Sequence, residues 1–100
     1  MNQCLLAIVA APQSEDALVD WLLTRAEVDG FTSLGIDGHA SGHRGLTLAE
    51  QVSGRQRKLM FQIHLPCDAA RIVIEALKRD FAGSGLHYWL TPVMEAGRLG

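Results

Sequence analysis

Eight consecutive apolar residues, Cys4 to Ala11, stand near the start of the chain and end at Pro12. The run is too short to span a bilayer, and no Lys or Arg precedes it as in the basic region of a signal peptide. A short, continuous apolar run is typical of a strand that is buried on both faces. In a chain of 100 residues, which builds one small core, this strand requires cover on both sides of its sheet.

Two amphipathic helices are predicted from the spacing of apolar residues. Ser14 is expected to cap the first helix, which continues at helical spacing through Arg25 to a stop at Gly30. Asp68 is expected to cap the second helix, in which apolar residues repeat with the helical period while charged residues point elsewhere. These apolar residues are Ala70, Val73, Ile74, Leu77 and Phe81.

Three further strands complete the pattern. Residues 31–37 form a weaker strand with an internal glycine, and residues 58–65 alternate with period two. Residues 87–93 form the last strand, whose internal proline suits a sheet edge. The order strand, helix, strand, strand, helix, strand predicts an α+β, ferredoxin-like βαββαβ fold, a four-stranded antiparallel sheet with both helices on one face. Residues 1–100 then form a single domain.

One face of this sheet has no cover in a monomer. The first strand is apolar on both sides, and Met60, His64 and the region of Tyr88 and Trp89 add further apolar surface. We therefore expect the sheet faces of several copies to pack together.

Composition and motifs exclude several functions. The formal net charge of −2 and the pI near 6.0 provide no general field for capturing nucleic acid or an anionic membrane. The sequence carries no catalytic motif, and Phe61 belongs to the core-facing set rather than to an RNA-stacking platform. The sequence therefore favours a protein that is not an enzyme, does not bind nucleic acid and does not insert into a membrane.

Cys4 and Cys67 are the two cysteines of the chain, and they lie far apart without a CxxC spacing. Neither a disulfide framework nor a structural zinc site follows from this pattern. Cys4 is interpreted as a small apolar residue of the first strand and Cys67 as a residue at the entry of the second helix, with their pairing left open. A reducing compartment fits this pattern, so we expect a cytoplasmic location.

Residues 38–54 form a glycine-rich segment that is long for a connection in so small a domain. His39 and His43 share this segment, and neutral imidazoles are common ligands of zinc, copper and nickel. The alternative is a pair of solvated loop histidines, because a stable metal site usually needs three or four ligands. The remaining ligands would come from Asp37, His87, Cys4 or another subunit.

Basic side chains gather where the long segment returns to the sheet. They are Arg55, Arg57 and Lys58, with Arg44 upstream. Such a cluster holds phosphate or carboxylate through charge-assisted hydrogen bonds, or it is solvated and pairs with acids such as Glu50. A turn at Gly83 and Gly85 can offer backbone N–H groups to an anion, and His87 follows it.

The element order, with its long segment between the second and third strands, resembles the PII-like superfamily over nearly the whole chain. Residues 42–45, Gly-His-Arg-Gly, are similar to the start of the PII T-loop, and residues 60–66 are similar to its third strand. Residues 54–57, 64–66 and 85–92 resemble a small branch of this superfamily, whose genes commonly lie beside heavy-metal efflux pumps. The resemblance implies a homotrimer that packs through its open sheet faces.

The same resemblance implies a regulator whose T-loop-like segment changes order when a ligand binds at the intersubunit cleft. A regulatory protein or a membrane efflux pump would then be engaged by Arg44, Thr47 and Glu50. Thr47 and Glu50 also match a capping box, which predicts a short helical turn.

The link to metal efflux favours a zinc, copper or nickel ion as the ligand, held in part by His39 and His43. One alternative is a nucleotide or other small anion bound by Arg44, Arg55, Arg57 and the Gly83–Gly85 turn, although no lysine follows that turn to meet a phosphate. The other alternative is an adaptor that binds no ligand.

Overall fold

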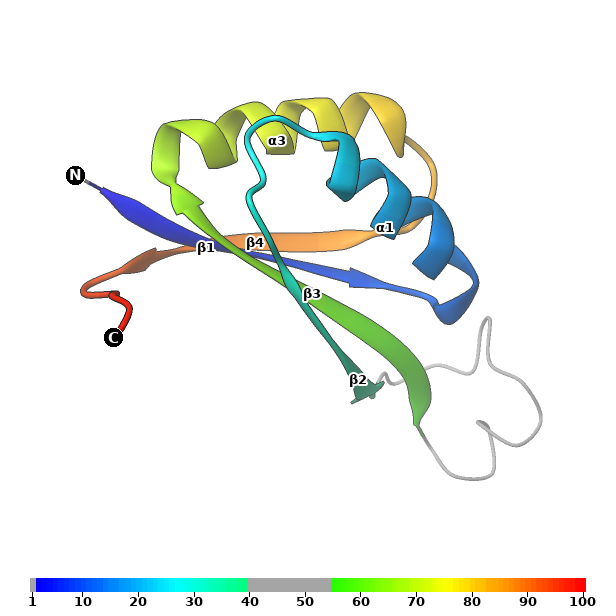
Figure 1. Ribbon diagram of the computed structural model, residues 1–100. Coiled ribbons are helices and arrows are strands. Elements are labelled where there is room, and N and C mark those ends of the chain that lie inside the picture. The colour runs from blue at the N-terminus through cyan, green and yellow to red at the C-terminus, as the bar shows by residue number, and fades with distance from the viewer. Residues whose placement is uncertain (1, 40–54) are drawn as a thin grey trace.

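The structure of the chain is a computed structural model, which describes residues 2–39 and 55–100. Within these residues, four antiparallel strands form one sheet in the order β2-β3-β1-β4, and both helices cover the same face (Figure 1). The strands are β1 (Gln3–Ala10), β2 (Thr32–Gly38), β3 (Gln56–Pro66) and β4 (His87–Val93). The helices are α1 (Glu15–Thr24), preceded by a 3-10 turn over Pro12–Ser14, and α3 (Cys67–Asp80). The predicted α+β, ferredoxin-like fold is confirmed, and no helix of the described residues is both long and apolar enough to cross a membrane.

β1 is a central strand that pairs with β3 on one side and with β4 on the other. Alternate side chains of a strand point to opposite faces, so Cys4, Leu6, Ile8 and Ala10 are buried beneath the helices. The side chains between them point to the face without helices, which we call the open face. β1 separates the core from this open face, which explains why its sequence is apolar on both sides.

β3 confirms the predicted alternation. Phe61 and Ile63 are fully buried in the core, whereas Met60, Gln62 and His64 belong to the open face. Phe61 is thus a core residue, as expected, and is not available to stack on a base.

α1 ends at Thr24, well before the stop predicted at Gly30. Arg25 leaves the helix with an extended backbone, at φ −81° and ψ 127°, and its Nη2 lies 3.0 Å from Oε1 of Glu27. Val28 then packs against the core. The helix ends where tertiary contacts become available, and not at the residue with the lowest helix propensity.

Neither helix receives the predicted side-chain cap. Ser14 occupies the N-cap of α1 without a side-chain hydrogen bond, and its N–H donates to Ala11 O at 3.0 Å. α3 begins at Cys67, so Asp68 lies in its first turn, where its Oδ1 accepts a hydrogen bond from Ala69 N at 2.9 Å. A carboxylate in the first turn still stabilises the helix by opposing its dipole.

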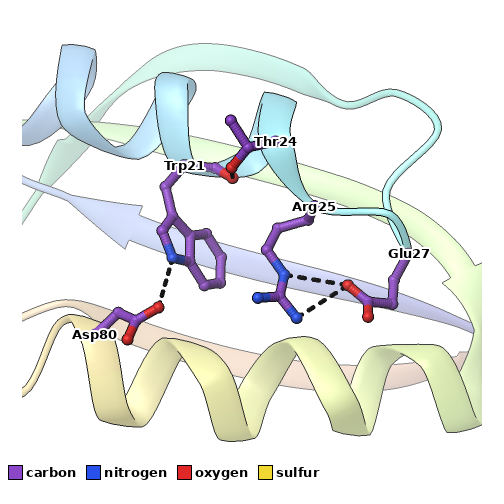
Figure 2. A network of polar contacts seen from close by, with 5 residues as sticks. All are labelled: Trp21, Thr24, Arg25, Glu27 and Asp80. Atoms are coloured by element: carbon purple, nitrogen blue, oxygen red, sulfur yellow. Dashed lines mark hydrogen bonds and ion pairs between the residues drawn. The ribbon is translucent and has the colours of Figure 1, made fainter.

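Trp21 ties the two helices together (Figure 2). Its Nε1 donates to Asp80 Oδ2 at 2.8 Å, and its ring meets that of Phe81 edge-on with 5.5 Å between centroids. The guanidinium of Arg25 lies 5.2 Å from the centroid of the indole ring. The hydrogen bond from Trp21, and then that from Arg79, lowers the pKa of the Asp80 carboxyl below its ordinary value of 3.8.

Cys4 and Cys67 are joined by a disulfide, with their Cα atoms 5.0 Å apart, which corrects their interpretation as separate structural residues. The physical reason is topological: β3 is antiparallel to β1 with Leu65 opposite Cys4, so the chain enters α3 beside the start of β1. Cys67 N also donates to Asn2 O at 3.1 Å. The cysteines no longer argue for a reducing compartment, and the cytoplasmic location remains a prediction.

The pair β2-β3 continues beyond the end of β1 as a two-stranded extension (Figure 1). β1 ends at Ala10 opposite Leu59, whereas β2 and β3 remain paired as far as Gly38 opposite Gln56. We call residues 36–38 and 56–58 the arm.

Candidate functional site

Most residues to which the sequence assigns ligand binding lie at one end of the sheet. β1 and β2 end there and β3 and β4 begin there, because neighbouring strands are antiparallel. The arm brings Asp37 and Arg57 to this end, and the turn at Gly83–Gly85 brings His87. Two groups of candidate residues therefore flank the end of the central strand.

The first group forms an exposed ion pair at the arm. Arg57 lies opposite Asp37 in the strand register, and Arg55 Nη1 lies 3.3 Å from Asp37 Oδ2. The side chains of Arg55 and Asp37 are 57% and 45% exposed. Such a pair contributes about 0–1 kcal/mol, so the contact with Asp37 itself opposes the transfer of Arg55 to an anionic ligand only weakly. Lys58 belongs to the opposite side of the arm, the open face, together with Ile36.

His39 follows the arm directly and is exposed. Its predicted metal partner, His43, lies outside the described residues, as do the predicted partner-binding residues Arg44, Thr47 and Glu50. Within residues 2–39 and 55–100, no group of three or more His, Cys, Asp or Glu could hold a metal ion. The thiol of Cys4, one of the further ligands considered, is committed to the disulfide. Metal binding by His39 and His43 stays a prediction.

The second group is the turn between α3 and β4. Gly83 and Gly85 adopt φ values of 76° and 82°, a backbone conformation that favours glycine. Ser84 N donates to Phe81 O at 3.1 Å, and Leu86 N donates to Ser84 Oγ at 3.3 Å. Two N–H groups of the turn are thus bonded within it, so it offers an anion fewer donors than a glycine-rich turn with all its N–H groups free.

A hollow of about 160 Å³ lies between the end of α3 and the start of β4. Its rim carries Lys78, whose Nζ lies 3.2 Å from Glu75 Oε2. The pKa of Lys78 is raised by Glu75 and, to a smaller degree, by Tyr88. The hollow is lined by Leu77, Lys78, Phe81, Ala82, Leu86 and Tyr88.

Sequence reasoning missed this hollow because it assigned Tyr88 and Trp89 together to the apolar open surface. Adjacent residues of a strand point to opposite faces, so the two aromatic side chains separate. Tyr88 lies opposite Ile8 on the helix side, whereas Trp89 lies opposite Ala7 on the open face. The period-two rule applied to residues 87–93 would have placed Tyr88 beside the end of α3.

The arm and the α3–β4 turn do not form one site within a single chain. β1 lies between β3 and β4, so the two groups are separated by two strand spacings, about 10 Å. Arg55 and Arg57 therefore lie apart from Gly83, Gly85 and His87. A site that uses both groups needs a long ligand or residues from a second copy.

The open face carries apolar side chains along its central strand and beside it, and no carboxylate of the described strands belongs to it. Leu34 and Trp89 remain 42% and 45% exposed there. The predicted contribution of Met60 and His64 to this face is confirmed. Its apolar residues are Leu5, Ala7, Val9, Leu34, Ile36, Met60, Trp89 and Val93, and its titratable residues are Lys58, His64 and His87.

No curated protein matches the sequence of the chain. The sequence profile of the family described as "Protein of unknown function (DUF3240)" matches residues 1–100. The chain belongs to the DUF3240 family. A solved DUF3240 protein from Shewanella baltica OS155 is 22% identical and superimposes with a TM-score of 0.80, covering 100% of this chain and 99% of that one.

PII-like proteins share the fold of this DUF3240 protein. The PII-like protein CPII from Thiomonas intermedia K12, solved with ADP, AMP and bicarbonate, is 20% identical with a TM-score of 0.71, covering 99% of this chain and 97% of that one. A protein described as PII-like from Thermus thermophilus is 16% identical with a TM-score of 0.65, covering 93% of this chain and 87% of that one. The resemblance to the PII-like superfamily is confirmed, and at these identities it concerns the fold.

Proposed function

We propose that this DUF3240 protein is a non-catalytic, homotrimeric PII-like regulator that binds a small anion between subunits. The single observation that carries the proposal is the open face, an apolar sheet surface that the helices leave uncovered. Burial of apolar surface contributes about 25 cal/mol per Å², so packing copies of this face together stabilises a small domain.

The charged groups of the open face leave its centre free for contact with copies of itself. Its strands contribute no carboxylate, and Lys58 lies in the arm beyond the end of β1, where its ammonium can stay hydrated when the face is covered. In a trimer built this way, the arm of one subunit extends past its own β1 towards a neighbour. The arm of one copy and the α3–β4 turn of another can then share one cleft.

Arg55 and Arg57 support an anion as the ligand. They stand at the root of the 38–54 segment, and the exposed pair of Arg55 with Asp37 costs little to exchange. CPII, which shares the fold, was solved with ADP, AMP and bicarbonate. A small carboxylate-like or phosphate-bearing anion fits these side chains through charge-assisted hydrogen bonds.

Anion binding at the root of the 38–54 segment would act as a population shift. The ligand favours one conformation of the segment, and Arg44, Thr47 and Glu50 then engage or release a partner, a regulatory protein or a membrane efflux pump. We place this regulator in the cytoplasm.

A second candidate ligand is a zinc, copper or nickel ion, which would connect the protein to heavy-metal homeostasis. It is favoured by His39, which follows the arm directly and shares the 38–54 segment with His43. Because two imidazoles are too few for a stable site, this ion would need ligands from neighbouring subunits.

The test combines analytical ultracentrifugation with calorimetry on the full chain. We expect a trimer at micromolar concentration, and heat of binding with bicarbonate, AMP, ADP or ATP. The double variant R55A/R57A should weaken that binding at least about tenfold, because it removes two charge-assisted contacts. The matched control R71A/R98A removes two exposed arginines away from the arm and should leave binding unchanged.

Each other outcome identifies a different function. A second outcome is heat of binding with zinc, copper or nickel that is lost in the H39A/H43A variant, together with no heat for any anion. This result would identify the ligand as a metal ion and not an anion. A well-formed trimer that gives no heat of binding with any of these ligands favours an adaptor. A monomer at micromolar concentration contradicts the proposal as a whole.

A further inference from the structure

The disulfide joins the two cysteines of the chain at a junction between three elements. Cys4 is the second residue of β1, and Cys67 is the first residue of α3, directly after β3 ends at Pro66. The bond crosses a sequence separation of 63 residues and leaves no free cysteine. No function described above uses it.

The two cysteine residues differ in exposure. Cys4 is 6% exposed and belongs to the core cluster, whereas Cys67 is partly exposed and packs against the edge of that cluster. A thiolate from solution is therefore expected to attack Sγ of Cys67 rather than Sγ of Cys4. Exchange at this bond needs access to only one of the two sulfur atoms.

The position of Cys67 also favours the reduced state. α3 has 14 residues, and the positive end of its dipole lies at Cys67. A thiolate at a helix N-terminus is stabilised by this dipole, which makes it a better leaving group and makes the corresponding disulfide easier to reduce. Asp68 acts in the opposite direction, but its carboxylate already accepts a hydrogen bond from Ala69 N.

The bond restrains a strand end that belongs to the open face. Cys4 stands between Gln3 and Leu5, and Leu5 lies opposite His64 and Thr91 in the same row of the open face. The disulfide and the hydrogen bond from Cys67 N to Asn2 O hold this end of β1 against the β3–α3 junction. Without the bond, the end of β1 depends on its ladder hydrogen bonds, on the hydrogen bond from Cys67 N to Asn2 O and on the packing of Cys4, and it frays more readily.

We propose that the Cys4–Cys67 disulfide is a site of reversible exchange with low-molecular-weight thiols, and that its reduction weakens assembly through the open face. The coupling to assembly rests on the trimer of the proposed function, whereas the exchange itself does not.

The exchange balances as two successive steps. A thiolate attacks Sγ of Cys67, the bond to Cys4 breaks, and the Cys4 sulfur leaves as a thiolate that takes up a proton. A second thiolate then attacks the external sulfur of the mixed disulfide and releases Cys67 as a thiolate, which also takes up a proton. Two external thiols are thereby oxidised to one disulfide, and the protein gains two electrons and two protons.

The experiment equilibrates the folded protein with mixtures of reduced and oxidised glutathione, counts thiols by alkylation and mass spectrometry, and measures association by ultracentrifugation. We expect the thiol count to change from zero to two across these mixtures without denaturant. The dissociation constant of the assembly should rise at least about tenfold on reduction. The C4S/C67S variant should behave like the reduced protein and ignore glutathione, and wild type reduced in place supplies the same comparison without a mutation.

A bond that resists excess reduced glutathione in the folded protein overturns the proposal. A trimer that is equally tight in both redox states overturns the coupling alone. A protein that exchanges but is monomeric in both states overturns the coupling together with the trimer of the proposed function.

Discussion

The substitution Cys67→Ser should remove about 4 kcal/mol from the free energy of unfolding. The bond closes a loop across 63 residues, and the chain-entropy relation gives about 4 kcal/mol for a loop of that size. Serine at position 67 changes little else, because this partly exposed residue begins α3, serine and cysteine have similar helix propensities, and Cys4 keeps its buried sulfur. A small domain has about 5–15 kcal/mol in total, so this is a large share of its stability.

The assay is chemical denaturation of the oxidised wild type and of Cys67→Ser at one protomer concentration, since association adds to apparent stability. In a thermal scan, the same difference corresponds to a lowering of the midpoint by roughly 15–30 °C. The control repeats both measurements with a reducing agent, where the two proteins should coincide because neither carries the crosslink. A difference of less than about 1 kcal/mol between the oxidised proteins would refute the loop-entropy reasoning.

Three further predictions concern the open face, the interhelical contact and the α3–β4 turn. Trp89→Glu places a carboxylate on the open face and should convert the assembly to monomer in ultracentrifugation, whereas Leu23→Glu, at an exposed position of α1, should not. Asp80→Asn should lower the free energy of unfolding at neutral pH, because the pKa of Asp80 in the folded protein lies below its ordinary value of 3.8. The advantage of the wild type is complete above about pH 3.8 and declines as the pH falls through the pKa of the folded state. A series of denaturation curves at different pH values measures this decline. Gly85→Ala should cost about 1 kcal/mol because of its φ of 82°, while Gly97→Ala, where the backbone has no such requirement, should be nearly neutral in the same assay.

The element order and most strand bounds could be predicted because local patterns determine them. The last strand was predicted at residues 87–93, as observed, and the period of β3 placed Phe61 in the core. These strands have one face against the helices, so the alternation of apolar residues in their sequence shows directly which side chains are buried.

The end of α1 and the pairing of the cysteines depend on contacts between distant segments. The helix stops where Val28 turns into the core, a contact with distant segments that no helix propensity encodes, and the local pair of Arg25 with Glu27 accompanies this turn. Cys4 and Cys67 could be interpreted as unpaired residues only while the strand order was left out of the argument. Once the third strand is laid antiparallel beside the first, the residue after Pro66 comes next to the start of β1, so the predicted topology already contained the signal.

The sequence names the candidate residues of the site, and the structure adds their arrangement, whereas their role in binding stays a prediction. Arg55, Arg57 and the Gly83–Gly85 turn reach the same end of the sheet, as their positions at strand starts require. Their separation follows from the position of β1 between β3 and β4, which the predicted βαββαβ topology implies but which was not applied to these residues.

Gln3 and Val93 are register partners on adjacent strands, so the start of β1 and the end of β4 lie side by side, away from the arm (Figure 1). A short linker can therefore join the two extremities, and the chain can be cut at the exposed turn after α3 to give a circularly permuted protein. Reporter groups fused at the present extremities would stand at the far end of the sheet from the arm, where they should disturb neither ligand capture nor the segment that signals it.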